Sequence, residues 1–199
     1  MIRAGLDAVH EAARCLQNPG AVLLVPTETV YGLLCRADDS AAVEKIYRMK
    51  HRDAAKRLGC FVAGLSDLKD LCPDRRVEAI AGKYCPGPLT IIARRKNGDT
   101  IGFRIPDHPF LQALLRETGM VLAQTSANRS GRPNVRTADE ALAELAEEPD
   151  IVIDGGAIPE GAQASTVLDA TGEELRIVRQ GKLVIAEASG KTDSARNIG

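Results

Sequence analysis

The sequence predicts an α/β fold in one domain, with a twisted mixed sheet and helices on its faces. Short runs of β-branched and aliphatic residues, typical of buried strands, recur along the chain between segments with helical apolar spacing. These strands and helices mix without strict alternation, which favours a mixed sheet over a purely parallel one. The 199 residues suit one domain, because no internal repeat or interior linker divides them.

Helices are expected where apolar residues recur at i, i+3 and i+4 next to start or stop signals. Asp7 is expected to cap the first helix, which Asn18-Pro19-Gly20 ends, and residues 38–40 offer caps for the second. Thr137 opens the last helix as part of a capping box. The expected helical stripes lie within residues 9–16, 43–47, 77–84, 110–115 and 142–145, with a short turn capped by Ser66-Asp67.

Strands are expected where short apolar runs stop at turn signals. Asn97-Gly98 is a typical hairpin turn between two of them, and Thr171-Gly172 joins the last two. Residues 1–186 are predicted to form the domain, and the polar residues 187–199 a flexible tail. The expected strands are residues 21–25, 58–62, 89–93, 101–105, 121–125, 151–153, 165–169 and 175–178.

Composition and charge exclude several classes of protein. A formal net charge of -1 argues against a protein that coats nucleic acid, although not against a local basic pocket for one nucleotide. The five cysteines are odd in number and form no C-x-x-C pair, so reduced thiols and a cytoplasmic location are expected. No apolar segment has membrane-spanning length, and the three histidines are dispersed, so neither a membrane contact nor a metal site is predicted.

The first candidate site is P-T-E-T-V-Y-G at residues 26–32, directly after the strand expected at 21–25. Its two threonines, Glu28 and Tyr31 carry hydrogen-bonding groups, which are costly to bury without partners. A ligand is one way to supply those partners. The alternative is an ordinary strand end whose hydroxyls bond the local backbone.

A run of cations follows the second expected helix. Lys50 stands seven residues after Val43, so it lies near the same inward face and either extends out to solvent or meets an anion. From Lys50 to Arg57, four of eight residues are cationic. Such a run is usually a solvated face, but a strand follows at once and places it at the mouth of the sheet. Neither common glycine-rich phosphate loop is present in the sequence.

The chain contains five motifs in one order: P-T-E-T-V-Y-G, then K-x-R at 50–52, P-G-P-L-T at 86–90, R-I-P at 104–106 and S-A-N-x-S-G at 126–131. Through them it resembles the YrdC/TsaC family, the threonylcarbamoyl-AMP synthases, over nearly the whole chain. The resemblance implies a YrdC-like fold and one reaction, in which L-threonine, bicarbonate and ATP give threonylcarbamoyl-AMP and pyrophosphate. That product feeds the threonylcarbamoyladenosine modification of tRNA. A triphosphate substrate usually brings Mg2+.

The resemblance also assigns roles to individual residues. No general base is assigned: Glu28 is one candidate, with an ion pair or a strand-end cap as equal alternatives. Arg52 suits bidentate binding of phosphate oxygens. The implied catalytic tetrad is Lys50, Arg52, Ser126 and Asn128. The implied ATP contacts are Arg52, Lys56, Thr100, Asn128, Arg136 and Arg179, and the implied threonine contacts are Thr29, Arg104, Ser126 and Ser165.

The sequence departs from the family pattern at several positions. Asp53 and Arg57 stand where family members usually have proline, which makes this loop less rigid, and Leu34, Arg136 and Gln180 also differ. Two other hypotheses stay open: an RNA-binding module without the chemistry, and a paralogue that uses another carbamoyl adenylate. For a synthase, we expect partner proteins of a transfer complex to pass the adenylate to tRNA, with at most a weak contact between this chain and RNA.

Overall fold

The computed structural model describes residues 1–188, apart from the side chain of Asp70. Its strands, in chain order, are β1 (Ile2–Ala4), β2 (Leu23–Val25), β3 (Gly32–Arg36), β4 (Gly59–Phe61), β5 (Leu89–Arg94), β6 (Thr100–Arg104), β7 (Leu122–Ser126), β8 (Ile151–Ile153), β9 (Thr166–Asp169) and β10 (Arg176–Arg179). They form one sheet in the order β1-β8-β2-β3-β7-β4-β6-β5-β9-β10.

The sheet is mixed, as the sequence predicts. The pairs β1 with β8, β2 with β8, β4 with β6, and β5 with β9 are parallel. The other neighbours are antiparallel, including the β5–β6 hairpin at the expected Asn97-Gly98 turn. The predicted α/β fold class is therefore confirmed.

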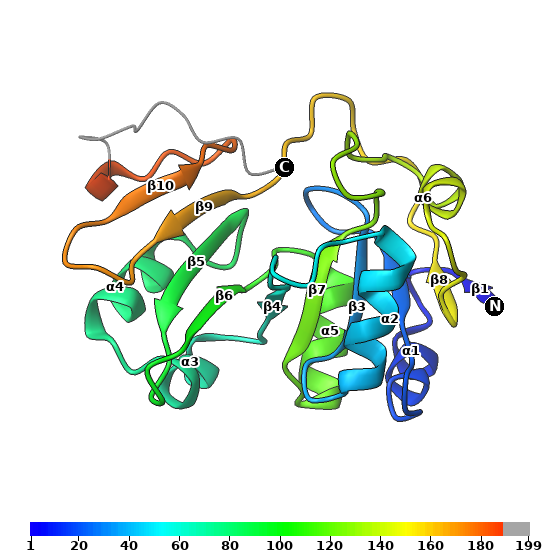
Figure 1. Ribbon diagram of the computed structural model, residues 1–199, viewed down its shortest axis with the longest axis horizontal. Helices are drawn as coiled ribbons and strands as arrows, with labels where there is room; N and C mark the ends of the chain where they lie inside the picture. The colour runs from blue at the N-terminus through cyan, green and yellow to red at the C-terminus, as the bar shows by residue number, and fades with distance from the viewer. Residues whose placement is uncertain (189–199) are drawn as a thin grey trace.

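Six α-helices and one short 3-10 helix lie among residues 1–188 (Figure 1). Asp39 caps the second helix by accepting from the Ala42 N–H at 3.0 Å, and Gly119 ends the fifth in the left-handed region, at φ 62. The helices are α1 (Val9–Cys15), α2 (Ser40–Lys50), α3 (Leu65–Leu71), α4 (Arg75–Tyr84), α5 (Pro109–Thr118), α6 (Ala138–Glu144) and η1 (Ala186–Ala188).

Three expected caps need correction. Helix α1 begins after Ala8 without a side-chain cap, so Asp7 does not cap it. Helix α3 begins at Leu65, before Ser66, and the Asp67 carboxylate accepts from the backbone N–H groups of residues 63 and 64 at 2.9 and 3.3 Å. In α6 the Thr137 hydroxyl accepts from the Glu140 N–H as expected, but the Glu140 carboxylate accepts from residue 136 rather than from Thr137.

Strands β1 and β3 lie outside the expected set. β1 is three residues long at the edge of the sheet, with two of them exposed, so it carries no apolar signal. β3 continues from the P-T-E-T-V-Y-G motif without a break and shares Gly32 with it, so its apolar residues look like the end of that motif. Only its pairing with β2 and β7 makes it a strand.

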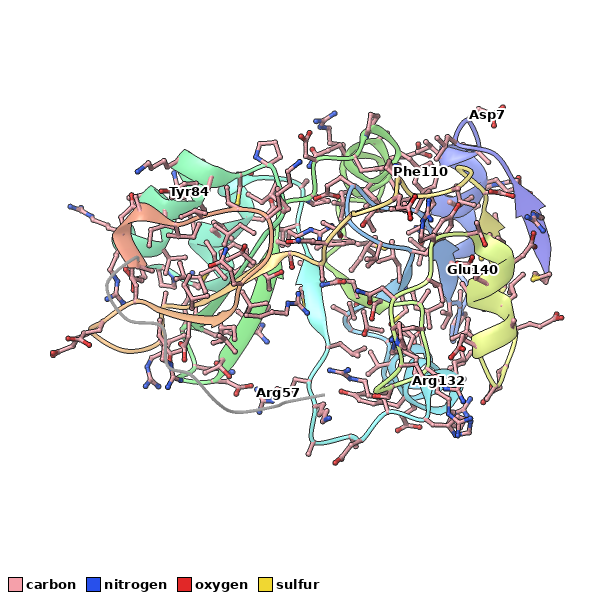
Figure 2. All side chains as sticks on the ribbon, turned by 90° about the horizontal axis from the view of Figure 1, so that it is seen from above. Asp7, Arg57, Tyr84, Phe110, Arg132 and Glu140 are labelled. Carbon is pink, nitrogen blue, oxygen red and sulfur yellow. The ribbon has the colours of Figure 1, made fainter. Side chains whose placement is uncertain are left out.

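Helices bury both faces of the sheet. Adjacent residues of β2 point to opposite faces, so Leu24 packs with α2 and α6, whereas Leu23 packs with α1 and α5. A third apolar cluster joins β5, β6 and β9 to α3 and α4. Seen from above, Phe110 of α5 lies toward one margin of the molecule, and Arg57 and Arg132 lie toward the opposite margin (Figure 2).

The five cysteines are free thiols, and burial raises the pKa of Cys35 to about 12 and that of Cys60 to about 11, so these two stay protonated near neutral pH. Every helix within residues 1–188 is too short or too polar to cross a lipid bilayer. Glu187 belongs to η1 and its carboxylate accepts from Lys83 and Tyr84 of α4, both at 2.7 Å. Ala188 of the predicted tail also belongs to η1, and residues 189–199 lie outside the described residues.

Candidate functional site

Two sequence motifs meet because β3 pairs with β7. In this antiparallel pair Gly32 lies opposite Ser126, and the Ala127 N–H donates to the Tyr31 carbonyl at 2.8 Å. The P-T-E-T-V-Y-G loop therefore lies beside the S-A-N segment, although the two are far apart in the sequence.

The P-T-E-T-V-Y-G loop has an internal framework centred on Thr27. Its hydroxyl accepts from the backbone N–H groups of Thr29 and Val30, at 3.0 and 3.1 Å, and donates to the Val30 carbonyl at 2.7 Å. Local backbone bonding thus accounts for Thr27, as the strand-end alternative expects. It does not account for Glu28 and Thr29, whose side chains bind a residue of another strand.

That residue is Arg104, at the end of β6, whose side chain is 5% exposed. Its Nη2 donates to the Glu28 carboxylate at 2.9 Å, and its Nη1 donates to the Thr29 hydroxyl at 3.1 Å. The guanidinium carbon lies 4.9 Å from the centre of the Phe61 ring, within range of a cation–π interaction. Its Nε is buried without a hydrogen-bond partner among the described residues. A buried unpaired donor costs roughly 1–3 kcal/mol, so this atom is suited to a ligand acceptor.

The charge of a second guanidinium, that of Arg179, acts on the first. Arg179 donates from Nε and Nη2 to the Ser165 carbonyl at 3.1 and 2.9 Å, and from Nη2 to the Ser165 hydroxyl at 3.2 Å. Burial lowers the pKa of Arg104, the Glu28 carboxylate raises it, and the charge of Arg179 lowers it. Two guanidinium groups with one carboxylate leave an excess positive charge, which favours an anionic ligand.

Lys50, the last residue of α2, is 1% exposed, so the alternative in which it extends into solvent is wrong. Its ammonium donates to the backbone carbonyls of Ser126 and of Asn128, the latter at 2.5 Å. Its own carbonyl accepts from the Ser130 N–H at 2.9 Å. Burial, followed by the charge of Arg52, lowers the pKa of Lys50 to about 7. Both ends of this residue thus hold the loop after β7.

Asn128 presents one open acceptor. Its Nδ2 donates to the carbonyls of Arg129 and Arg132 at 3.1 and 2.6 Å, and these two acceptors identify the nitrogen end of the amide. Its Oδ1 is buried without a partner among the described residues, and the residue is 6% exposed. An amide oxygen accepts hydrogen bonds only, so this atom is suited to a ligand donor.

The cationic loop after α2 folds back on itself. Arg52 donates from Nε and Nη2 to the carbonyls of Lys56 and Arg57, at 2.9 and 3.1 Å. Arg57 donates to the Asp99 carboxylate at 2.5 Å and to the Thr100 carbonyl at 3.2 Å, which ties the loop to the start of β6. Arg57, which departs from the family pattern, therefore has a structural partner.

The predicted site residues form four contact groups: Thr29 with Arg104, Lys50 with Ser126 and Asn128, Arg52 with the Lys56 carbonyl, and Ser165 with Arg179. Arg136 joins none of these groups, because its Nε donates to the Ile158 carbonyl at 3.0 Å.

Sequence reasoning leaves Glu28 open and omits Thr90. The Thr90 hydroxyl lies 2.8 Å from the Ser165 hydroxyl. The only sequence feature that could have indicated Thr90 is its place in the P-G-P-L-T motif. That motif supports the family resemblance, but it does not by itself mark any of its residues as a site residue.

Known proteins resemble this chain along most of its length. The Sua5/YciO/YrdC family model, described as "Telomere recombination", matches residues 16–181. The human threonylcarbamoyl-AMP synthase is 36% identical over 184 residues, which cover 88% of this chain and 66% of that protein. The Chromohalobacter salexigens threonylcarbamoyl-AMP synthase is 34% identical over 185 residues, which cover 85% of this chain and 97% of that protein.

A solved structure shares the fold. Pyrococcus abyssi Sua5 complexed with L-threonine superposes with a TM-score of 0.82 at 29% identity, over 92% of this chain and 57% of that one. The chain thus spans about two thirds or less of the length of the human and archaeal relatives. A family model that covers most of the chain, together with relatives above 30% identity, shows that this chain belongs to the Sua5/YciO/YrdC family.

Proposed function

We propose that this protein is an L-threonylcarbamoyladenylate synthase, a nucleotidyltransferase that joins L-threonine, bicarbonate and ATP and releases pyrophosphate. The relatives named threonylcarbamoyl-AMP synthase and the archaeal neighbour bound to L-threonine support this proposal. The observation that carries it is Arg104, whose buried guanidinium has an unpartnered Nε and is acted on by the charge of a second guanidinium. An amino-acid carboxylate would satisfy that donor and offset the excess positive charge.

The proposed reaction has two bond-forming steps. The threonine ammonium loses a proton, and bicarbonate takes up a proton and loses water to give CO2. The free amine attacks CO2, which forms an N–C bond, and the nitrogen then releases a proton to leave a carbamate. A carbamate oxygen then attacks the α-phosphorus of ATP, and the bond to the β-phosphate oxygen breaks as pyrophosphate leaves. The carbamate is already an anion, so the second step requires no general base. Positioning and electrostatic stabilisation therefore carry most of the catalysis.

The contact groups suggest a division of roles. Arg104 and Ser165 bind the threonine carboxylate, with Thr29 and Ser126 completing that site. The Asn128 Oδ1 accepts from a donor such as a ribose hydroxyl, because phosphate oxygens accept and do not donate. Lys50 holds the loop that carries Ser126 and Asn128. The nucleotide side of the proposed site comprises Arg52, Lys56, Thr100, Asn128, Arg136 and Arg179.

We count Mg2+ as part of the substrate, carried on the phosphates of ATP. Among the described residues no group of three or more His, Cys, Asp or Glu side chains is arranged to hold a metal, and both Glu28 oxygens are committed to donors. Within residues 1–188 the side chains therefore do not fit a resident metal site.

We also propose a cytoplasmic location, which the free thiols support. The adenylate then passes to partner proteins of a transfer complex that modify tRNA, with at most a weak RNA contact by this chain, in keeping with its net charge of -1.

One assay tests the proposed activity. The purified protein is incubated with ATP, Mg2+, bicarbonate and radiolabelled L-threonine, and both the labelled adenylate and pyrophosphate are measured. The expected result is equimolar formation of the two products, dependent on threonine and on bicarbonate. Pyrophosphate release without threonine would indicate a different carbamoyl adenylate. No turnover together with tight binding of labelled tRNA would indicate an RNA-binding module.

A further inference from the structure

The Glu28 carboxylate has no role in the division proposed above. One oxygen accepts from the Arg104 guanidinium at 2.9 Å, and the other accepts from the Asp107 N–H at 3.2 Å. Its side chain is 16% exposed. Both oxygens are thus committed to donors of other segments, which leaves Glu28 poorly suited to take a proton from a substrate.

The contacts of Arg104 restrict how its guanidinium can turn. Stacking on Phe61 fixes the plane of the group but leaves rotation within that plane free. The bonds from Nη1 to Thr29 and from Nη2 to Glu28 remove that rotation, and the bond to Glu28 is the charge-assisted and therefore stronger one. With both in place, the unpartnered Nε has a fixed direction.

Glu28 also sets the charge of the site. Arg104 and Arg179 repel each other, as the lowering of the Arg104 pKa by Arg179 indicates. With the Glu28 carboxylate present, these groups carry one excess positive charge, which favours an anionic ligand. Without it they carry two, and the repulsion is unopposed.

We propose that Glu28 is a positioning and specificity-determining residue: it holds Arg104 so that the site selects an amino acid by its carboxylate. This inference rests on the proposed function. Glu28 acts through Arg104 and takes no part in proton transfer. The Asp107 bond contributes by anchoring the Glu28 carboxylate to the segment before α5.

The test compares L-threonine with L-threoninamide, which lacks the carboxylate charge, in wild-type, Glu28→Gln and Glu28→Asp proteins. In Glu28→Gln we expect the KM for threonine to rise at least tenfold, while the KM for ATP changes less than twofold. The preference for threonine over threoninamide should fall by a similar factor. Glu28→Asp keeps the charge on a shorter side chain. Its KM for threonine and its preference for threonine should lie between those of wild type and Glu28→Gln.

Asp150→Asn is the matched control. The Asp150 carboxylate also accepts from one backbone N–H, that of Val22, and from one cation, Lys45, both at 2.8 Å, but it contacts neither Arg104 nor the motif loop. It should lower the melting temperature without changing the preference for threonine. If Glu28→Gln does not fold, Glu28→Asp still provides the comparison.

Three outcomes overturn the inference. A threonine KM in Glu28→Gln within twofold of wild type would show that Arg104 does not depend on Glu28. A lower kcat with unchanged KM, or loss of the acid limb of the pH–rate profile, would make Glu28 a proton acceptor instead. An Asp150→Asn protein with the same loss of preference would reduce the effect to stability. Failure of the wild-type protein to use threonine would reject the proposed function rather than the role of Glu28.

Discussion

Gly32 of β3 lies opposite Ser126 of β7, and a side chain at position 32 would not fit there without movement. A Cβ atom on Gly32 would lie 3.2 Å from the Thr125 carbonyl oxygen and 3.7 Å from the Thr27 methyl group. This register, which joins the motif loop to the strand carrying Ser126, therefore depends on a residue without a side chain.

Gly32→Ala is expected to lower the free energy of unfolding by about 1–2 kcal/mol, because the β3 and β7 backbones must move apart. Synthase activity should fall with it. Gly102→Ala in β6 is the control, since its Cβ would meet nothing closer than 3.8 Å. Denaturant unfolding measures both variants, and equal stabilities would contradict the role of this close approach.

Lys50→Met should be strongly destabilising. It removes the ammonium that satisfies the Ser126 and Asn128 carbonyls, and each unpaired buried group costs roughly 1–3 kcal/mol, so a loss of about 3 kcal/mol is expected. Lys83→Met removes an exposed ion pair with Glu187, which solvent screens, and should therefore cost much less. Chemical denaturation distinguishes the two, and similar losses would mean that Lys50 does not hold the loop.

The pH dependence of the unfolding free energy should also reveal the lowered pKa of Lys50. Its pKa is lowered from 10.5 in the unfolded chain to about 7 in the folded protein, so between these values the unfolded state binds more protons. Its contribution to stability therefore rises with pH across this window, with a slope below the limit of about 1.4 kcal/mol per pH unit. The measurement is the difference in unfolding free energy between wild type and Lys50→Met from pH 7 to 10. A difference that is flat or falls with pH would refute the shift.

His51 ends α2 in the left-handed region, at φ 49, where residues with a side chain are strained. His51→Gly should leave stability unchanged or raise it by up to about 1 kcal/mol, because glycine adopts this conformation without steric cost. The β-branched His51→Val should instead lower stability by about 1–2 kcal/mol. Thermal unfolding of the two variants gives the order, and a more stable valine variant would contradict it.

Arg104→Lys should raise the KM for threonine at least tenfold without a comparable change for ATP. An ammonium cannot bind Glu28, Thr29 and a ligand carboxylate in the fixed directions of a guanidinium. Arg176→Lys, on an exposed ion pair with Asp169, should leave both values unchanged. Steady-state kinetics with each substrate varied in turn is the measurement, and an unchanged threonine KM would remove Arg104 from that site.

Local sequence patterns predicted which way a side chain points, but not which residues it contacts. The inward position of Lys50 follows from its spacing to Val43, because a helix places residues seven apart on one face. Its partners, the carbonyls of Ser126 and Asn128, come from the end of β7 and the loop after it, which no local signal connects to α2. The helical spacing thus predicts that Lys50 is buried, whereas its contact with the Ser126 and Asn128 carbonyls depends on how the strands pair across the sheet.

The ion pair between Glu28 and Arg104 could not be derived from local pattern for the same reason. It depends on the placement of β4 between β6 and β7, and on the pairing of β7 with β3. Strand order is set by the packing of the whole chain, whereas propensity and periodicity act within about ten residues. Thr90 was missed because a lone strand threonine is usually a packing residue, and only the nearby Ser165 hydroxyl gives it another partner.

The position of β8 has a consequence for how the chain acquires its structure during translation. β8 pairs with β1 on one side and with β2 on the other, so β1 has no partner strand, and the edge of β2 away from β3 stays unpaired, until residues 151–153 have left the ribosome. One edge of apolar β2 therefore stays unpaired for most of synthesis. Such long-range closure slows folding, so a nascent chain halted before residue 151 should be a strong substrate for chaperones.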